Sequence, residues 1–163
     1  MLPTKRQAVL AKAADLMDAR REEIADWLVK ESGSSRLKAG LEIDNAIGIT
    51  REAATFPLRM EGELYPSVTP GKENRVYHQP VGVVGVISPW NFPFHLSMRS
   101  VAPALGAGNG VVLKPASNTP VTGGTLVGAL FEEAGVPAGL VNVVPGSGSE
   151  IGDAVVVHPV PRV

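Results

Sequence analysis

Residues 81–115 read VGVVGVISPWNFPFHLSMRSVAPALGAGNGVVLKP and carry the clearest fold signal in this chain of 163 residues. The apolar, β-branched run Val81–Ile87 is typical of a strand that is buried on both faces. It stops at Ser88-Pro89-Trp90-Asn91-Phe92-Pro93, and a helix fits Pro93 to about Leu105. A second apolar run, Gly110–Lys114, follows after a short glycine-rich turn. This stretch therefore predicts a strand, a helix and a second strand in succession.

The same alternation continues after these two strands. A helix is predicted over Pro120–Ala134, with Thr119 as its cap and Gly135 just past its end. A third strand, Leu140–Val144, and a third helix, Gly148–Val157, follow. Strands that alternate with helices through short loops imply right-handed crossovers and a parallel sheet. The expected fold class is α/β, with a partial doubly wound, Rossmann-like parallel sheet.

The residues before this sheet show a different pattern. Apolar residues at helical spacing predict two helices over residues 3–31. A third helix should run to about Phe56, with Ser34 or Ser35 as its cap. Two short strands joined by a Pro-Gly turn predict a β-hairpin over Leu64–His78. Helices and a hairpin are thus expected to precede the parallel sheet.

Composition and charge exclude several classes of function. The net charge of −1 gives no electrostatic reason to expect nucleic acid or a membrane surface as a partner. No apolar run is long enough to span a bilayer, and the amino end does not resemble a signal peptide. The chain has no cysteine, and its three histidines lack metal-ligand spacing, so we expect no disulfide and no metal site. A cytoplasmic location is the default expectation.

The loop after the first parallel strand is the leading candidate for a functional site. Ligands of open parallel sheets bind at the carboxyl ends of the strands, where Asn91 lies between Pro89 and Pro93. The two prolines restrict the backbone, so the Asn91 amide should be presented rigidly to an oxygen that gains negative charge. Alternatively, Asn91 only caps the helix that begins near Pro93.

Two further features belong to the same edge of the predicted sheet. Lys114 ends the second strand, where a cation is well placed to meet a ligand, although a solvent-exposed lysine explains it too. The segment Gly146–Gly152 follows the third strand and is one residue longer than the dinucleotide fingerprint. A tight turn with helix packing is the alternative there. The glycines of Gly106–Gly110 fall at the opposite edge and are better explained as a helix C-cap turn.

Four motifs together resemble the NAD(P)-dependent aldehyde dehydrogenase family, and the resemblance covers nearly the whole chain. They are Pro89–Pro93, Lys114–Ser117, Glu133–Pro137 and Asn142–Gly146, in that order. The resemblance implies an oxidoreductase that converts an aldehyde to a carboxylic acid with NAD or NADP. A resemblance to the benzaldehyde and vanillin dehydrogenase-like branch implies an aromatic aldehyde. The family resemblance also implies that the nucleophilic cysteine and the glutamate base lie in absent segments. The chain is therefore expected to be an amino-terminal fragment that is inactive alone.

The resemblance also implies roles for individual residues. Asn91, with a backbone N–H, holds the oxyanion that forms when a cysteine thiolate attacks the aldehyde. Lys114 binds the adenosine ribose, and Ser117 stands where many NAD-preferring members carry glutamate, which leaves both NAD and NADP open. For Trp90, packing at the strand end is an equal alternative to a place beside the nicotinamide. The implied cofactor-binding residues are Ile87, Ser88, Pro89, Trp90, Lys114, Ser117, Gly148 and Gly152.

The change of pattern near Pro80 is the predicted domain boundary. By the resemblance, residues 1–80 form part of an interdomain or oligomerisation region, and residues 81–163 form a partial NAD(P)-binding domain. We expect the full-length enzyme to be a homo-oligomer that acts on a small aldehyde. Two alternatives from other classes remain open: a non-catalytic nucleotide-binding module, and a structural fragment that assembles through the hairpin.

Overall fold

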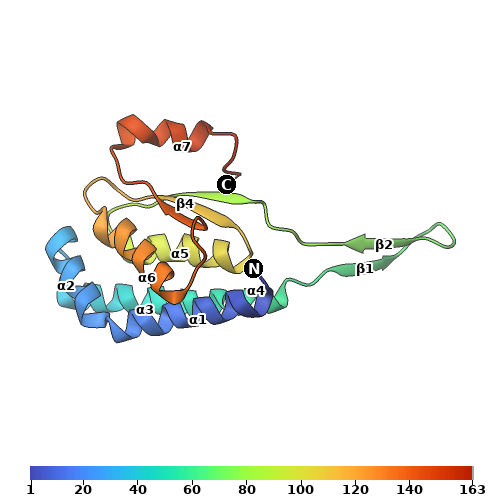
Figure 1. The fold of residues 1–163 in the computed structure, drawn as a ribbon, viewed down its shortest axis with the longest axis horizontal. Helices are drawn as coiled ribbons and strands as arrows, with labels where there is room; N and C mark the ends of the chain where they lie inside the picture. The colour runs from blue at the N-terminus through green and yellow to red at the C-terminus, as the bar shows by residue number, and fades with distance from the viewer. Residues whose placement is uncertain (163) are drawn as a thin grey trace.

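Three parallel strands form the centre of the fold in a computed structural model that describes residues 1–162 (Figure 1). The strands are β3 (Val83–Ile87), β4 (Gly110–Lys114) and β5 (Val141–Val143), and they lie in the order β3-β4-β5. Each strand is followed by helical residues before the next begins, as the alternating sequence pattern predicts. The predicted α/β fold class, with helices and a hairpin before a parallel sheet, is confirmed.

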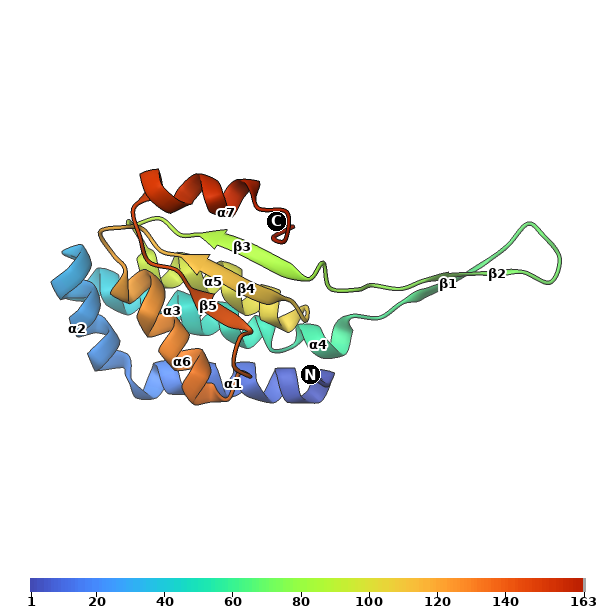
Figure 2. The same cartoon turned by 45° about the horizontal axis from the view of Figure 1, so that its top comes forward.

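Two layers of helices lie on one side of this sheet (Figure 2). The inner layer consists of α5 (Pro93–Gly106) and α6 (Leu126–Ala134), which pack on the strands. The outer layer contains α1 (Pro3–Ala19) and α3 (Arg36–Ala53), which pack on α5 and α6. Helix α2 (Arg21–Ser32) packs on α3. Within residues 1–162, no helix is both long and apolar enough to cross a bilayer.

The hydrophobic core lies between these two helical layers and continues between the inner layer and the sheet. Its largest fully buried side chains include Leu10 and Met17 from α1, Ile43 from α3, Phe94 from α5 and Phe131 from α6. Leu10 and Met17 belong to the apolar stripe that the helical spacing predicts for the first helix. The core therefore fixes the position of α5, the helix that follows the candidate loop.

Helix α3 begins as predicted, but it ends earlier than predicted. The Ser35 hydroxyl accepts a hydrogen bond from the backbone N–H of Lys38 at 3.2 Å, which makes Ser35 the cap. The helix ends at Ala53 instead of near Phe56, and a short helix, α4 (Phe56–Arg59), follows.

The helix predicted from residue 120 to residue 134 differs from the prediction in two ways. It begins with a π-helical turn, η1 (Val121–Thr125), before it continues as α6. Thr119 is not its cap, since the Thr119 hydroxyl is buried and has no hydrogen-bond partner. The Glu31 carboxylate of α2 accepts hydrogen bonds from the backbone N–H groups of Val121 and Thr122, at 2.8 and 2.7 Å. A charged side chain from another helix has therefore taken the place of the predicted local cap.

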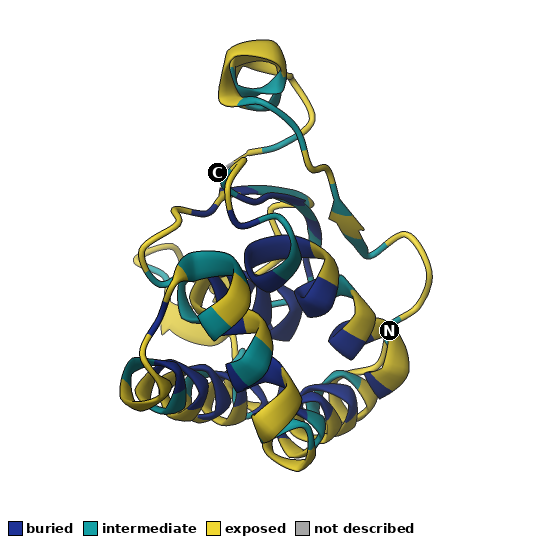
Figure 3. Cartoon of the chain, turned by 90° about the vertical axis from the view of Figure 1, so that its left-hand side faces the viewer, coloured by how far each residue is buried: buried dark blue, intermediate teal, exposed yellow. Residues whose placement is uncertain are grey.

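Strand β3 is not buried on both faces, contrary to the prediction. Only Val86 is buried, and Ile87 is 52% exposed. The reason is that the helices α5 and α6 cover a single face. On the other side, η2 (Gly148–Gly152) and α7 (Asp153–Val157) contain no buried residue and stand away from the body of the molecule (Figure 3).

The predicted hairpin is confirmed, and it extends away from the rest of the molecule (Figure 1). Strands β1 (Glu63–Pro66) and β2 (Glu73–Val76) pair antiparallel, and every residue of both strands is exposed. A two-stranded ribbon with both edges free offers unpaired backbone groups to another strand.

Candidate functional site

The loop after β3 and the end of β4 lie side by side at the carboxyl edge of the sheet. In the parallel register, Ile87 is opposite Lys114. The backbone N–H of Ser88 then donates to the carbonyl oxygen of Lys114 at 3.0 Å. This edge is where ligands of open α/β sheets bind.

The Asn91 side chain is exposed and forms no hydrogen bond with any other part of residues 1–162. It does not cap α5, so the alternative of a helix cap is wrong. The backbone N–H groups of Phe94 and His95 at that helix start donate instead to the Glu42 carboxylate, at 2.8 and 3.2 Å. The Asn91 amide is consequently available to a ligand.

The other residues of this loop differ in exposure. Ser88 is 3% exposed, and its hydroxyl contacts the carbonyl oxygen of Pro93 at 3.5 Å. Trp90 is 60% exposed, so its ring is not held by packing at the strand end in this chain. Pro89 is exposed as well. The loop thus has a buried base at Ser88 and an accessible tip.

Lys114 is buried, with 4% of its surface exposed, so the alternative of a solvent-exposed lysine is wrong. Its ammonium donates one hydrogen bond, to the carbonyl oxygen of Pro115 at 3.1 Å. Within residues 1–162 it forms no ion pair. An ammonium has three donors, and burial without further partners is costly, so this group suits an oxygen-rich ligand.

Ser117 connects the loops that follow β4 and β5. Its hydroxyl donates to the carbonyl oxygen of Gly146 at 3.2 Å, and the residue is exposed. The loop that begins at Lys114 and the glycine segment are therefore adjacent at the same edge as Asn91.

Gly148 and Gly152 face open space. A Cβ atom built on either glycine would meet no atom within 4 Å, so helix packing does not explain them. Gly146 differs, because a Cβ there would lie 2.7 Å from the Ile151 Cδ1 atom. The hollow between β3 and α7, of about 340 Å³, is lined by Gly85, Ile87, Val155, Val156, Pro161 and Arg162.

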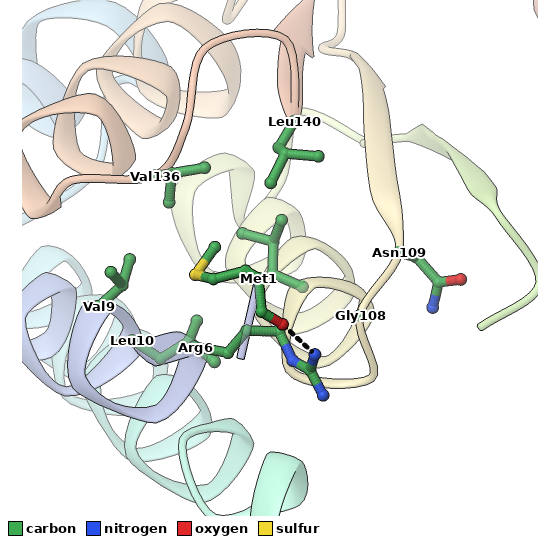
Figure 4. Close-up of a pocket in the computed structure, with 9 residues that line it drawn as sticks. Met1, Arg6, Val9, Leu10, Gly108, Asn109, Val136 and Leu140 are labelled. Carbon is green, nitrogen blue, oxygen red and sulfur yellow. Dashed lines mark hydrogen bonds between the residues drawn. The ribbon is translucent and has the colours of Figure 1, made fainter. Parts of the chain in front are cut away.

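A smaller cavity, of about 80 Å³, lies at the opposite end of the strands and is separate from this site (Figure 4). It lies beside Asn109 and Leu140, which precede β4 and β5, and most of its lining is apolar. Arg6 closes one side and donates to the carbonyl oxygen of Met1 at 2.9 Å. The turn there contains Gly108 at φ +90°, which confirms the predicted helix C-cap turn.

Sequence reasoning missed the two carboxylates that cap helices beside the site, Glu31 and Glu42. Glu42 occupies a core-facing position in α3, among the buried residues Ala39, Ile43 and Ala46. A charged residue inside an apolar stripe is rarely buried without a partner, and that signal was available in the sequence. Glu42 is connected to the candidate loop through the backbone N–H groups of Phe94 and His95 at the start of α5.

His95 lies in the first turn of α5 and is partly buried. Burial lowers the pKa of the His95 imidazole, and the Arg99 cation acts in the same direction while Glu42 opposes it. Its Nδ1 atom is buried without a hydrogen-bond partner. Among the described residues, no group of three or more His, Asp or Glu side chains could hold a metal ion.

Comparison with known proteins places this arrangement among related sequences. Residues 1–163 match the sequence profile of the aldehyde dehydrogenase family. Over 158 residues the chain is 62% identical to a vanillin dehydrogenase of Corynebacterium glutamicum, and over 161 residues it is 57% identical to a benzaldehyde dehydrogenase of Bacillus subtilis. These alignments cover 97% and 99% of the chain and 33% of each relative, so the chain spans about a third of their length.

A solved structure is similar over the same extent. The crystal structure of an NAD-dependent benzaldehyde dehydrogenase from Corynebacterium glutamicum superposes with a TM-score of 0.97 at 60% identity. The match covers 99% of this chain and 35% of that one.

Proposed function

Because this chain belongs to the aldehyde dehydrogenase family, we propose that residues 1–163 are part of an enzyme that oxidises an aromatic aldehyde to a carboxylic acid with NAD or NADP. The observation that carries the proposal is the free, exposed Asn91 amide at the carboxyl edge of the sheet, one loop away from the buried Lys114 ammonium. The similarity to vanillin and benzaldehyde dehydrogenases supports an aromatic substrate.

In this proposal the Asn91 side chain is the catalytic group that the chain supplies. Its amide N–H donates to the carbonyl oxygen of the substrate as that oxygen gains negative charge. A preorganised donor is most effective when the charge appears only in the transition state. Within residues 1–162, Asn91 has no hydrogen-bond partner, which supports this role because the donor does not have to break another bond first.

The residues at the sheet edge fit a dinucleotide. Lys114 has unused donors for ribose hydroxyls, and Gly148 and Gly152 leave space for close approach of a ligand to the backbone. Ile87, Ser88, Pro89 and Trp90 would adjoin the nicotinamide, and Ser117 the ribose. Bound there, the cofactor would supply hydride acceptance. The similarity to an NAD-dependent benzaldehyde dehydrogenase supports NAD as the cofactor, while Ser117 carries no charge that would repel the 2′-phosphate of NADP.

We also propose the organisation of the whole enzyme. Residues 1–80 would belong to an interdomain or oligomerisation region and residues 81–163 to the cofactor-binding domain. The exposed β1–β2 hairpin supports a homo-oligomer in which this ribbon pairs with another strand. Sedimentation of the complete enzyme tests this assignment, and a monomer would contradict it.

The test is turnover of benzaldehyde and vanillin with each cofactor by the complete enzyme that contains residues 1–163. We expect turnover by the wild type. Asn91→Ala should lower kcat by roughly 100- to 1000-fold, the usual loss for one oxyanion donor, with little change in cofactor affinity. Residues 1–163 alone should be inactive, because they contain no cysteine to act as the nucleophile.

Three results would contradict the proposal. A complete wild-type enzyme that oxidises no aldehyde rejects the function and favours a nucleotide-binding module or an assembly role. Single-turnover hydride transfer near the wild-type rate in Asn91→Ala rejects the role of Asn91. Turnover by residues 1–163 above a protein-free control rejects the need for a separate nucleophile.

A further inference from the structure

We infer that Glu42 is a positioning residue for the reaction, because it fixes the place of Asn91 through the start of α5. This inference rests on the proposed function. Glu42 lies on α3, and its side chain is completely buried. One carboxylate oxygen, Oε1, accepts hydrogen bonds from the backbone N–H groups of Phe94 and His95 at 2.8 and 3.2 Å.

The helix start needs this carboxylate. The first backbone N–H groups of a helix have no partner within the helix. Phe92, at the cap position of α5, offers no side-chain acceptor, and Pro93 has no N–H. A negative charge at this end is also favoured by the helix dipole. Glu42 therefore supplies the cap that the sequence of α5 itself does not contain.

The second carboxylate oxygen of Glu42 extends its influence to the residue beside Asn91. Oε2 accepts from the Lys38 ammonium at 3.1 Å. The same ammonium donates to the Ser34 hydroxyl at 2.9 Å and lies 4.2 Å from the centre of the Phe92 ring. A cation at that distance from an aromatic face is attracted to it. Phe92 is thus held through Lys38 while Phe94 is held directly.

The other side of the loop is anchored by the sheet. Ser88 is fixed by its backbone hydrogen bond to Lys114, and only Pro89, Trp90 and Asn91 lie between this anchor and Phe92. With so few residues and a proline between the anchors, a shift of the α5 start has to move Asn91. Oxyanion stabilisation requires the donor at hydrogen-bond distance from the position of the developing charge, so a small shift lowers the rate.

Within residues 1–162, the hydrogen bonds of Glu42 go to Lys38, Phe94 and His95. None goes to the residues proposed to bind the adenosine half of the cofactor, which are Lys114, Ser117, Gly148 and Gly152. At the nicotinamide end, Ile87 and Ser88 are held by their pairing with β4 and do not depend on Glu42. Its loss should therefore change the chemical step and leave cofactor binding nearly unaltered. If Glu42 contributed only to folding, its loss would lower the hydride-transfer rate and the cofactor affinity together.

The experiment uses the complete enzyme and two substitutions of Glu42. Glu42→Gln keeps an oxygen for the two N–H groups but loses the charge that pairs with Lys38. Glu42→Ala removes both. We expect single-turnover hydride transfer to benzaldehyde at saturating NAD to fall about 10-fold in Glu42→Gln and on the order of 100-fold in Glu42→Ala, with the cofactor dissociation constant within about twofold of wild type.

Glu31→Gln is the matched control. Glu31 is also a carboxylate of one helix that caps the start of another, η1, but that start does not carry Asn91. Its hydride-transfer rate at saturating NAD should stay within about threefold of wild type. A rate loss in Glu31→Gln equal to that in Glu42→Gln would overturn the inference, because capping in general would then explain it.

Hydrogen exchange of the Phe94 and His95 amides provides a readout that does not require activity. These amides should exchange faster in Glu42→Gln than in wild type, and at the wild-type rate in Glu31→Gln. Wild-type hydride transfer in a Glu42→Gln enzyme whose amides exchange faster would overturn the inference. If Glu42→Ala does not fold, Glu42→Gln decides. A wild type that oxidises no aldehyde rejects the proposed function, whereas amide exchange and hydride transfer that are both unchanged in Glu42→Gln reject the charge of Glu42 as the group that positions Asn91.

Discussion

Ser117 is the residue at this edge on which the choice of cofactor depends in our proposal. It is exposed, and its hydroxyl is engaged with the carbonyl oxygen of Gly146. A neutral hydroxyl neither repels a phosphate nor accepts strongly from a ribose diol. Lys114, three residues earlier, contributes positive charge to the same loop, and positive charge attracts the 2′-phosphate of NADP.

Ser117→Glu should therefore shift the preference of the complete enzyme toward NAD. A carboxylate accepts hydrogen bonds from the ribose hydroxyls and repels the 2′-phosphate of NADP. The measured quantity is the ratio of kcat/KM for NAD to that for NADP, which should rise by at least about 10-fold, or 1.4 kcal/mol. Ser117→Ala separates loss of the Gly146 contact from gain of charge, and Asn118→Glu places the same charge on the exposed neighbouring residue. An unchanged ratio would show that Ser117 does not face the ribose.

At the scale of whole elements, the helices differ in how their starts are capped. Helix α3 is capped locally by Ser35, within its own sequence. The starts of α5 and η1 are capped from outside, by Glu42 and Glu31. Both of these helices follow a loop of the candidate site. The sheet edge is therefore held in place by α2 and α3 as well as by its own strands.

Glu31→Ala should loosen the start of η1. The carboxylate accepts from the backbone N–H groups of Val121 and Thr122 and from the Thr122 hydroxyl, so its loss leaves donors without an acceptor. Hydrogen exchange at these two amides should report a local opening free energy lower by about 2 kcal/mol, and by about 1 kcal/mol in Glu31→Gln. Glu132→Ala, an exposed glutamate of α6, is the control. Equal exchange in Glu31→Ala and Glu132→Ala would contradict this prediction.

Which elements could be predicted from sequence depends on whether their determinants are local. Apolar periodicity and the serine and glycine signals at helix ends are local, so the helices, the hairpin and the alternation of three parallel strands with helices were predicted correctly. The prediction that Thr119 caps its helix was wrong because the group that accepts the helix N–H bonds, the Glu31 carboxylate, lies about 90 residues away in sequence. The burial of β3 was also predicted wrongly, since an apolar run does not reveal whether the second face is covered.

The candidate site divides in the same way. The direction of the strands predicts which edge of the sheet carries the site, and the positions of Asn91 and Lys114 just after and at strand ends predict that both residues lie at that edge. That Asn91 is free, Lys114 buried and Glu42 engaged depends on contacts between distant segments, which a single sequence does not display. The catalytic role of Asn91 and the cofactor-binding roles of the eight other site residues stay predictions.

At the scale of the whole molecule, two regions lack the packing of the rest. Helix α7 has no buried residue, and its Val156 and Val157 are 71% and 76% exposed. The hairpin strands are exposed along their whole length, with Leu64 at 65%. Contiguous apolar surface and open strand edges of this kind favour association.

Residues 1–163 by themselves should consequently self-associate. Sedimentation velocity on the purified chain should show species larger than a monomer. Replacing Val156 and Val157 with aspartate should reduce them, because charge opposes burial of this surface. The control is Leu37→Asp, which changes an exposed leucine of α3 that lies outside both regions. A monodisperse wild-type monomer would contradict the prediction and would favour the alternative that residues 1–163 are a nucleotide-binding module on their own.

The two outside caps also bear on how such a sequence can change by recombination. Glu31 and Glu42 lie before residue 80, whereas the four backbone N–H groups they satisfy belong to Phe94, His95, Val121 and Thr122. A crossover near residue 80 that brought in helices without those carboxylates would leave all four donors unmatched, even though every strand and glycine of the cofactor edge remained. The two halves of this chain are therefore expected to be inherited together, and a successful hybrid has to preserve acidic side chains at two helix positions whose partners are backbone N–H groups of the other half.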